Sequence, residues 1–313
     1  MTLTFAATPR TAGQQHRRKP RRRPAVRRAL TGWAFTGPAT FIVVGLSLFP
    51  AIWAFFISRT KWNGISEPVD IGWSNYQRFA DDPDLAAAAQ HTLVLTVLFV
   101  PASIFAGMLL AIALNRKIRL IGFYRTCIFV PYVASAASTG ILASYVFNPQ
   151  FGAANDALRR LGLPTQQFLE NPHQALVVVC IIALWGEVGF TTVVYLAALQ
   201  DVPRELIEAA TVDGAGRWKI FLNVTLPQLR PVTLFTTIWQ TITALQLFDL
   251  IYTTTRGGPM NSTQTIVYYI YELAFQTRRL GYGAAVAYLL FAATLVLTGL
   301  VIWRSRRSDE EAF

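Results

Sequence analysis

The chain reads EAATVDG at residues 208–214 and VTLP at residues 224–227, between two apolar segments that are each long enough to cross a bilayer. Residues 204–210, RELIEAA, which contain its first three residues, are mostly good helix formers. Gly214 and Gly216 follow it, and glycine reaches left-handed backbone conformations without a steric cost. The pattern therefore predicts a short helix, a glycine turn and a second short helix over residues 217–224. Together they form a small knob on a polar loop.

The composition of the whole chain is that of a membrane protein. It is 53% hydrophobic and 14% charged, whereas soluble domains carry about 25% charged residues. The formal charge of +11 suits either nucleic acid or a membrane surface, but nine of the 28 Lys and Arg lie between Arg10 and Arg28 and the rest mostly flank apolar runs. We therefore expect residues 1–32 to be a basic tail drawn to anionic lipid, not a nucleic-acid-binding arm. The tail and the apolar run after it are expected to act as an uncleaved signal anchor.

Six apolar runs predict an all-α membrane bundle. Each is near the ~20 residues that a helix needs to cross about 30 Å of hydrocarbon. The expected spans and the tail after them are residues 33–57, 91–114, 121–147, 175–199, 231–252 and 284–303, followed by a C-terminal tail at 304–313.

The distribution of Lys and Arg predicts how these spans are oriented. The two tails and the loops at 115–125 and 200–230 hold 20 of these residues, and the three loops on the other side hold eight. Positive charge accumulates on the cytoplasmic side. Both termini and the loop with the EAA stretch are therefore expected in the cytoplasm, with residues 33–303 forming a multi-pass domain in a bacterial inner membrane.

The order of EAA, Gly214 and Leu226-Pro227 resembles the EAA loop of the membrane subunits of ATP-binding-cassette importers, where Ile more often stands in place of Val224. The resemblance implies the type I importer permease fold, with six transmembrane helices and a cytoplasmic coupling-helix loop. An ordinary amphipathic connector is the alternative. The coupling residues that the resemblance implies are Glu208, Ala209, Ala210, Asp213, Gly214, Leu226 and Pro227.

The second half resembles the carbohydrate branch of that family, the maltose and glycerol-phosphate permeases. The stretches that carry this resemblance are FNP at 147–149, YLAALQ at 195–200, FDLIY at 248–252, GGP at 257–259 and YYIY at 268–271. It implies a sugar or related polyol or glycerol-phosphate as cargo. It also implies a second homologous permease, a nucleotide-binding ATPase dimer and an extracytoplasmic substrate-binding protein as partners. The chain has no G-x-x-x-x-G-K-[ST] phosphate loop, so we expect no cofactor in this chain, with ATP and Mg²⁺ bound by the ATPase.

Polar side chains inside the spans are the candidates for the transport pathway. Gln240, Thr243 and Gln246 share about one helix face of the fifth span, and Asp249 lies near its outer end. Such groups are costly in lipid and tend to face the protein interior; hydrogen bonding between helices is the alternative role. Glu187 lies in the middle of the fourth span, where a carboxyl group must pair, protonate or meet water. It either contacts a substrate hydroxyl or a cation, or it forms a structural pair.

Two other classes of function remain as alternatives, an integral-membrane enzyme and a scaffold. An enzyme needs catalytic groups that converge at one place, and the His, Cys and acidic residues of this chain are scattered. For the same reason we expect neither catalytic residues nor a metal site. A scaffold or receptor would need a sizeable soluble domain, for which the loops between the spans leave no room.

Overall fold

Helices account for nearly all of the regular structure in this computed structural model, which describes residues 25–116 and 119–310, with side chains described for 32–116 and 119–304. Most of the predicted basic tail therefore lies outside the described residues. The chain forms two units, one that ends at Trp53 and one that begins at Ala54. The described part of the first unit is helical and continues into the second through its last helix. Its elements are α1 (Ala25–Val43), the π-helical η1 (Val44–Leu48) and α2 (Phe49–Ser58).

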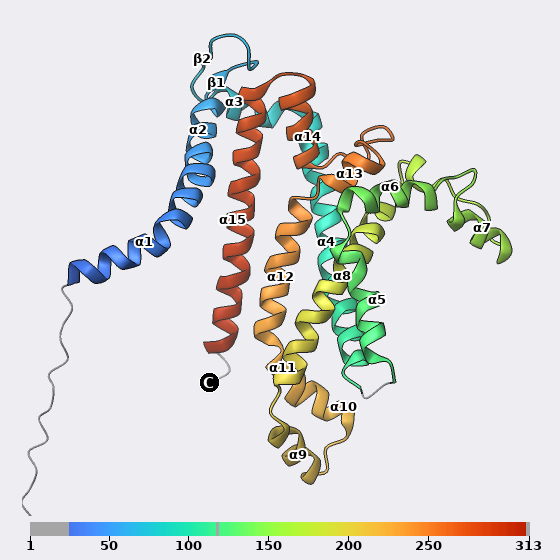
Figure 1. Cartoon of the computed structure of the whole chain (residues 1–313). Helices are drawn as coiled ribbons and strands as arrows, with labels where there is room; N and C mark the ends of the chain where they lie inside the picture. Colours follow the sequence, from blue (N-terminus) through green and yellow to red (C-terminus); the bar gives the residue numbers. More distant parts are fainter. Residues whose placement is uncertain (1–24, 117–118, 311–313) are drawn as a thin grey trace, which may run out of the picture. The chain divides into compact units, whose positions relative to one another are not determined.

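The second unit holds the remaining helices and one small antiparallel hairpin (Figure 1). In the first half of this unit the elements are β1 (Thr60–Lys61), β2 (Val69–Asp70), α3 (Ser74–Gln77), η2 (Arg78–Asp81), α4 (Pro83–Leu114), α5 (Ile121–Val133), α6 (Ala136–Val146), α7 (Ala153–Arg160) and η3 (Phe168–Glu170). In the second half they are α8 (Ala175–Asp201), α9 (Arg204–Val212), α10 (Arg217–Ile220), η4 (Phe221–Thr225), α11 (Leu226–Gln228), α12 (Arg230–Leu245), α13 (Asp249–Thr254), α14 (Ile266–Tyr271), η5 (Glu272–Gln276) and α15 (Leu280–Glu310).

Five described helices are long and apolar enough to cross a membrane, and a sixth crossing is possible if α5 and α6 together make one. The five are Gly32–Ser58, Pro83–Leu114, Ala175–Asp201, Arg230–Thr254 and Leu280–Arg304. The second begins at Pro83, earlier than the expected residue 91. The last helix runs on to Glu310, through most of the segment expected as a C-terminal tail.

The expected span over residues 121–147 is not one continuous helix, because the chain bends by 99° between α5 and α6. Ala134 and Ser135 have extended ψ angles of 146° and 132°. Pro131 lies three residues before this link. Proline has no N–H to donate and its ring crowds the preceding turn, which weakens the last turn of α5. The apolar composition is the same for a straight and a bent helix, so it carries no sign of the break.

Asp82 fixes the start of α4. One carboxylate oxygen accepts hydrogen bonds from the backbone N–H groups of Asp84 and Leu85, both at 3.1 Å, which is the N-cap arrangement. The other accepts from the hydroxyls of Tyr269 at 2.8 Å and Tyr282 at 2.6 Å. Burial alone would raise the pKa of Asp82, but these four hydrogen bonds outweigh it and hold the pKa below its usual value. One carboxylate therefore joins α4, α14 and the first turn of α15.

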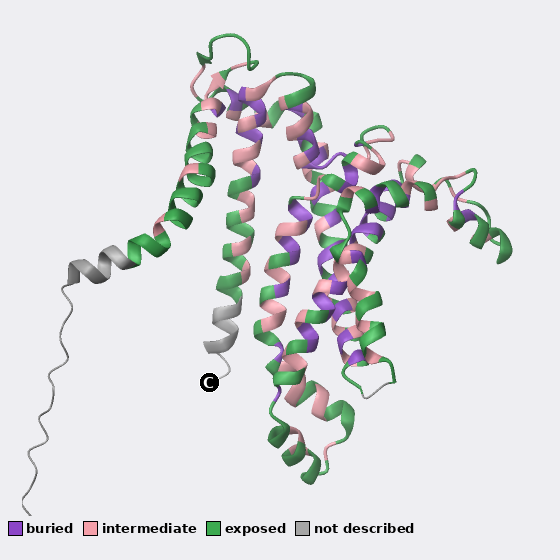
Figure 2. Ribbon diagram, viewed as in Figure 1, coloured by how far each residue is buried: buried purple, intermediate pink, exposed green. Residues whose placement is uncertain are grey.

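The core of the second unit lies where α4, α8 and α12 pack together. Figure 2 shows buried positions repeating along these three helices, while α9 and α10 are mostly exposed. At the end nearest the EAA stretch, Tyr195 of α8 and Leu229 are fully buried and pack with Ala111 and Leu114 of α4. The Tyr195 hydroxyl also donates a hydrogen bond to Thr233 of α12 at 3.0 Å. This cluster ties the three long helices together next to the predicted coupling loop.

Candidate functional site

The EAA loop folds as the predicted helix–turn–helix. Gly214 has φ of +77°, which only glycine adopts cheaply. Its N–H donates to Thr211 O at 3.1 Å, and the N–H of Ala215 donates to Ala210 O at 3.0 Å. This pair of hydrogen bonds is the Schellman C-cap, which satisfies the last carbonyls of α9. Gly216 plays no such part: its φ of −69° and ψ of 159° are open to any residue. The prediction that both glycines make the turn was therefore wrong for Gly216.

The coupling knob, residues 204–222, is exposed although part of its surface is apolar. No residue of α9 or α10 is buried. Val212 is 87% exposed and Trp218 is 72% exposed, and Leu206 and Leu222 are also exposed. The Trp218 ring stacks on Phe221 with centroids 5.8 Å apart. Exposed apolar side chains are a common feature of protein–protein contact surfaces. The knob lies between the end of α8 and the beginning of α12 (Figure 1).

A polar cluster lies deep between α4, α8 and α12. Gln240 Nε2 donates a hydrogen bond to Thr191 Oγ1 at 2.7 Å, and Ser103 lies 3.1 Å from the same hydroxyl. All three side chains are fully buried. Glu187 lies one helical turn before Thr191, on the same side of α8. Among the described residues, Glu187 Oε2 and Gln240 Oε1 are buried without a hydrogen-bond partner. Each of these two oxygens has the capacity to accept a further hydrogen bond.

A cavity of about 140 Å³ adjoins this cluster. Glu187 and Thr243 both line it, so the structure brings these two predicted residues together. Gln240 does not line it; it lies in the polar cluster, bonded to Thr191. Gln246 is exposed at the C-cap of α12, and Asp249 is exposed at the start of α13. Neither of them lines the cavity, so a place for them in the pathway stays a prediction.

Sequence reasoning missed the contribution of the bent pair α5–α6. Tyr132 and Thr139, on the two sides of the bend, line the cavity opposite Glu187 and Thr243. Tyr132 also stacks on Phe190 at 5.1 Å between ring centroids, and Phe190 lies 5.2 Å from Trp239. Pro131, which also lines the cavity, was the residue from which the bend could have been predicted.

A comparison with protein families identifies the chain. The profile described as "Binding-protein-dependent transport system inner membrane component" matches residues 103–308, which is more than half of the sequence. This chain belongs to that family of permeases. The lactose transport system permease protein LacF of Rhizobium radiobacter is 36% identical over 283 residues, 88% of this chain and 94% of LacF. The sulfoquinovosyl glycerol transport system permease protein SmoG of Agrobacterium fabrum is 32% identical over 275 residues, 87% of this chain and 89% of SmoG.

Solved structures confirm the predicted fold of the permease. A chain of a bacterial ABC transporter involved in the import of the acidic polysaccharide alginate superposes with a TM-score of 0.80 at 24% identity. The match covers 90% of this chain and 97% of that chain. The importer-permease fold is thereby confirmed, and the permease is a multi-pass protein of the inner membrane.

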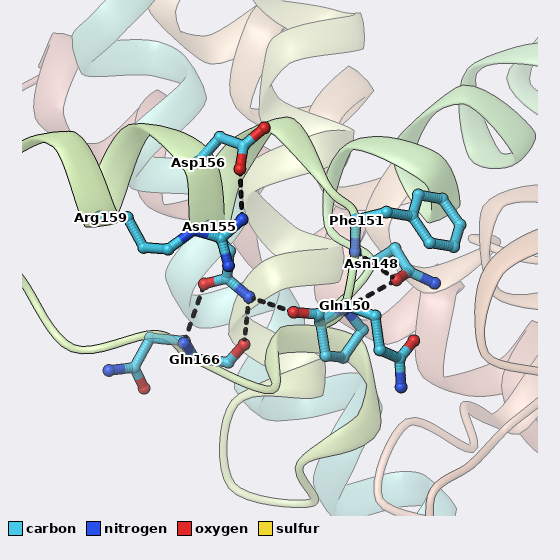
Figure 3. Close-up of polar contacts among 8 residues, drawn as sticks. Asn148, Gln150, Phe151, Asn155, Asp156, Arg159 and Gln166 are labelled. Atoms are coloured by element: carbon cyan, nitrogen blue, oxygen red, sulfur yellow. Dashed lines mark hydrogen bonds and ion pairs between the residues drawn. The ribbon is translucent and has the colours of Figure 1, made fainter.

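The loop of this permease between α6 and α8 is held in shape by asparagine side chains (Figure 3). Asn155 is fully buried; its amide donates to Pro149 O at 3.0 Å and Gln166 O at 2.8 Å and accepts from Gln166 N at 2.9 Å. Asn148 Oδ1 accepts from the N–H groups of Gln150 and Phe151. The loop therefore presents a preorganised surface. Its exposed apolar side chains are Phe151, Leu161 and Leu163.

Proposed function

We propose that this permease is the non-catalytic half of an ABC importer for a sugar or a related polyol or glycerol-phosphate solute. The observation that carries the proposal is the coupling knob, where Gly214 caps a short helix and apolar side chains stand exposed. An exposed Trp218 on a loop between two long helices suits a partner that closes over it. In the proposal this partner is one subunit of an ATPase dimer, which binds ATP and Mg²⁺ and hydrolyses the ATP.

The coupling step follows from how the knob is attached. Two residues separate the end of α8 at Asp201 from the start of α9, and Leu229 alone separates the short helix α11 from α12. The fully buried Tyr195 and Leu229 join α8 and α12 at that end. When the ATPase dimer closes, the knob and both helices move together and the bundle alternates between its outward and inward states, as rigid elements of transporters do.

The cargo is proposed from the cavity and from the relatives. LacF is named for lactose, SmoG for sulfoquinovosyl glycerol and NgcF of Streptomyces coelicolor for diacetylchitobiose. Glu187 Oε2 and Gln240 Oε1 offer unused acceptors to hydroxyl groups, and Tyr132 supplies an aromatic wall. None of the residues that line the cavity is Lys or Arg, which favours a neutral sugar. UgpA of Agrobacterium fabrum is named for sn-glycerol-3-phosphate, so an anionic cargo would take its cation from the second permease.

The distribution of Lys and Arg between the two sides gives the proposed orientation, and this orientation places the remaining partners. With 20 Lys and Arg on the side of the coupling knob and eight on the other, both termini are cytoplasmic. The loop over residues 148–170 and the turn at 257–259 then face outward. They line a shared pocket of about 390 Å³. In the proposal a substrate-binding protein docks on this outer face, and a second homologous permease completes the pathway.

Co-purification and uptake test the proposal. The tagged chain is expressed from its native host, purified in mild detergent, and its companions are identified by mass spectrometry. We expect a second permease, an ATPase and a binding protein, and sugar uptake by proteoliposomes of the complex that requires ATP. The binding protein is then screened against neutral sugars and glycerol-phosphates. Recovery of the chain without an ATPase in several detergents, or uptake that proceeds without ATP, contradicts the proposal.

A further inference from the structure

A basic pocket lies at the end of the second unit opposite to the coupling knob. β1, α3 and the first turn of α15 pack together there (Figure 1). The pocket between them has a volume of about 600 Å³. Lys61, Arg78, Arg278 and Arg279 line it, with Glu67 as the one acidic residue among the lining residues. The outer loops hold only eight Lys and Arg, so half of the basic residues on that side converge on one pocket.

The positive charge in this pocket has no counterpart in the described part of the chain. The ion pair found among the described residues is Arg159–Asp156, in a different loop, so Glu67 pairs with none of the four cations. Asp82 is close in sequence to Arg78, but its oxygens are taken up by two tyrosines and two backbone N–H groups. Arg279 Nη2 is buried and has no hydrogen-bond partner within the described residues. A buried guanidinium donor in that state needs an acceptor.

Two of the arginines are held in place without being neutralised. The guanidinium carbon of Arg78 lies 4.9 Å from the ring centroid of Tyr282, and that of Arg279 lies 5.0 Å from it. Such contacts orient a cation but leave its N–H groups free for an anion. Tyr282 is itself fixed by its hydrogen bond to Asp82. The pocket is therefore a preorganised arrangement of donors.

The walls of the pocket are rigid as well. Asn75 donates to Ser58 O at 2.8 Å and to Thr60 O at 2.9 Å. Gly281 N donates to Trp62 O at 3.3 Å. A Cβ at Gly281 would lie 1.9 Å from Thr60 O, so α15 approaches β1 as closely as it does because this position is glycine. These contacts close the pocket around the four cations independently of any ligand.

The four cations flank the ends of candidate membrane spans, where lipid headgroups are expected. Lys61 follows the candidate span that ends at Ser58, Arg78 precedes the one that begins at Pro83, and Arg278 and Arg279 directly precede the one that begins at Leu280. The geometry points to a binding site for the phosphodiester headgroup of an anionic phospholipid, clamped between the ends of three spans. Arginine suits phosphate oxygens because its N–H groups form a planar fork. The leaflet, the outer one, follows from the proposed orientation, but the binding site itself does not depend on it.

Native mass spectrometry of the full chain in mild detergent tests this site. The probes are phosphatidylglycerol and phosphatidylcholine with identical acyl chains, and inorganic phosphate. One Lys or Arg contributes about a fivefold change in affinity for anionic lipid. The wild type should retain phosphatidylglycerol in preference to phosphatidylcholine, and the double substitution Arg78→Gln, Arg279→Gln should weaken this binding about 30-fold. Arg159→Gln, Arg160→Gln removes two cations from another outer loop and should leave it unchanged.

A second pair of substitutions separates ligand binding from folding. Lys61 and Arg278 are exposed, so Lys61→Gln, Arg278→Gln should fold normally and still weaken phosphatidylglycerol binding by a similar factor. Thermal unfolding midpoints confirm that the variants are folded. Equal retention of phosphatidylglycerol by wild type and both pocket variants overturns the inference, and so does an equal loss in the Arg159, Arg160 control. Displacement of bound lipid by inorganic phosphate alone would show a soluble oxyanion site and refute the lipid assignment.

Discussion

Gly214 offers the sharpest test of the proposed coupling role of the knob, because a side chain added there changes the backbone energetics without making a new contact. Its φ is +77°, and a Cβ added there would meet no atom within 4 Å. A residue other than glycine in this left-handed region costs roughly 1–2 kcal/mol. Part of that cost is offset because alanine restricts competing loose states of the turn, by about 0.4–1 kcal/mol. For Gly214→Ala we therefore expect a net cost near 1 kcal/mol, or about a fivefold loss of the capped knob.

A series of substitutions at this turn tests whether backbone strain is the cause of the expected loss. Gly214→Asn should cost less than Gly214→Ala, since asparagine tolerates the left-handed region, and Gly214→Val should cost more. Gly216→Ala is the matched control, because Gly216 has φ of −69° and no atom within 4 Å of an added Cβ. It lies two residues away on the same exposed loop.

The assay measures substrate uptake and ATP hydrolysis on the same proteoliposomes. We expect uptake per ATP to fall in the order Gly216→Ala, Gly214→Asn, Gly214→Ala, Gly214→Val, with the first equal to wild type. Hydrolysis itself should persist, because this chain holds no part of the proposed ATPase site. If Gly214→Val transports with wild-type coupling, the cap is not what transmits the motion. If Gly216→Ala fails as badly as Gly214→Val, the loop is sensitive to any side chain and the strain argument is refuted.

Three further predictions follow from buried polar groups. Glu187→Gln should raise the half-saturation concentration for uptake by roughly two- to tenfold, as expected for one lost hydrogen bond, while co-purification with the ATPase stays intact; unchanged uptake kinetics would make Glu187 structural. Asn155→Ala removes three hydrogen bonds and should destabilise the 148–170 loop by about 2–3 kcal/mol. The backbone amides of this loop should then exchange hydrogen faster than they do in the control Asn171→Ala, which removes one hydrogen bond. Because the pKa of Asp82 is depressed in the folded protein, its stabilisation is complete above about pH 4 and is lost as the pH falls through the folded pKa. The unfolding midpoint of wild type should therefore converge on that of Asp82→Asn under acid, and a constant gap at all pH values would contradict this.

The helix–turn–helix structure of the EAA loop could be predicted from the sequence because each of its signals is local. Helix formers, a glycine after them and the Leu226-Pro227 pair lie within about twenty residues, and the capping bonds of Gly214 and Ala215 reach back only into α9. The error over Gly216 has the same origin. The residue type shows that both glycines are able to adopt a left-handed conformation. Which of the two does so depends on the residue at which α9 ends.

The pathway side chains could be predicted only in part, because their environment is made by distant segments. Glu187 and Thr243 stood out as polar groups in apolar runs, and both line the cavity. Gln246 was assigned to the same helix face as Gln240, but α12 ends at Leu245 and the repeat stops there. The contribution of Tyr132 and Thr139 depends on the 99° bend between α5 and α6. A hydropathy pattern does not reveal that bend, since α5 and α6 are both apolar.

The cavity and the knob are mechanically connected, because α8 and α12 contribute to the cavity and also flank the knob. Glu187 precedes the end of α8 at Asp201 by fourteen residues, or about 20 Å of helix at 1.5 Å per residue. Gln240 and Thr243 follow the start of α12 at Arg230, and the hydrogen bond from the Tyr195 hydroxyl to Thr233 joins the two helices between these levels. A small rotation at the knob therefore cannot be absorbed by a loop before it reaches the polar cluster. The bond from Gln240 to Thr191 crosses from α12 to α8, so sliding of one helix past the other would break it. Under the proposed mechanism, the buried hydrogen bond between Gln240 and Thr191 therefore belongs to one state of the bundle and breaks when the knob moves.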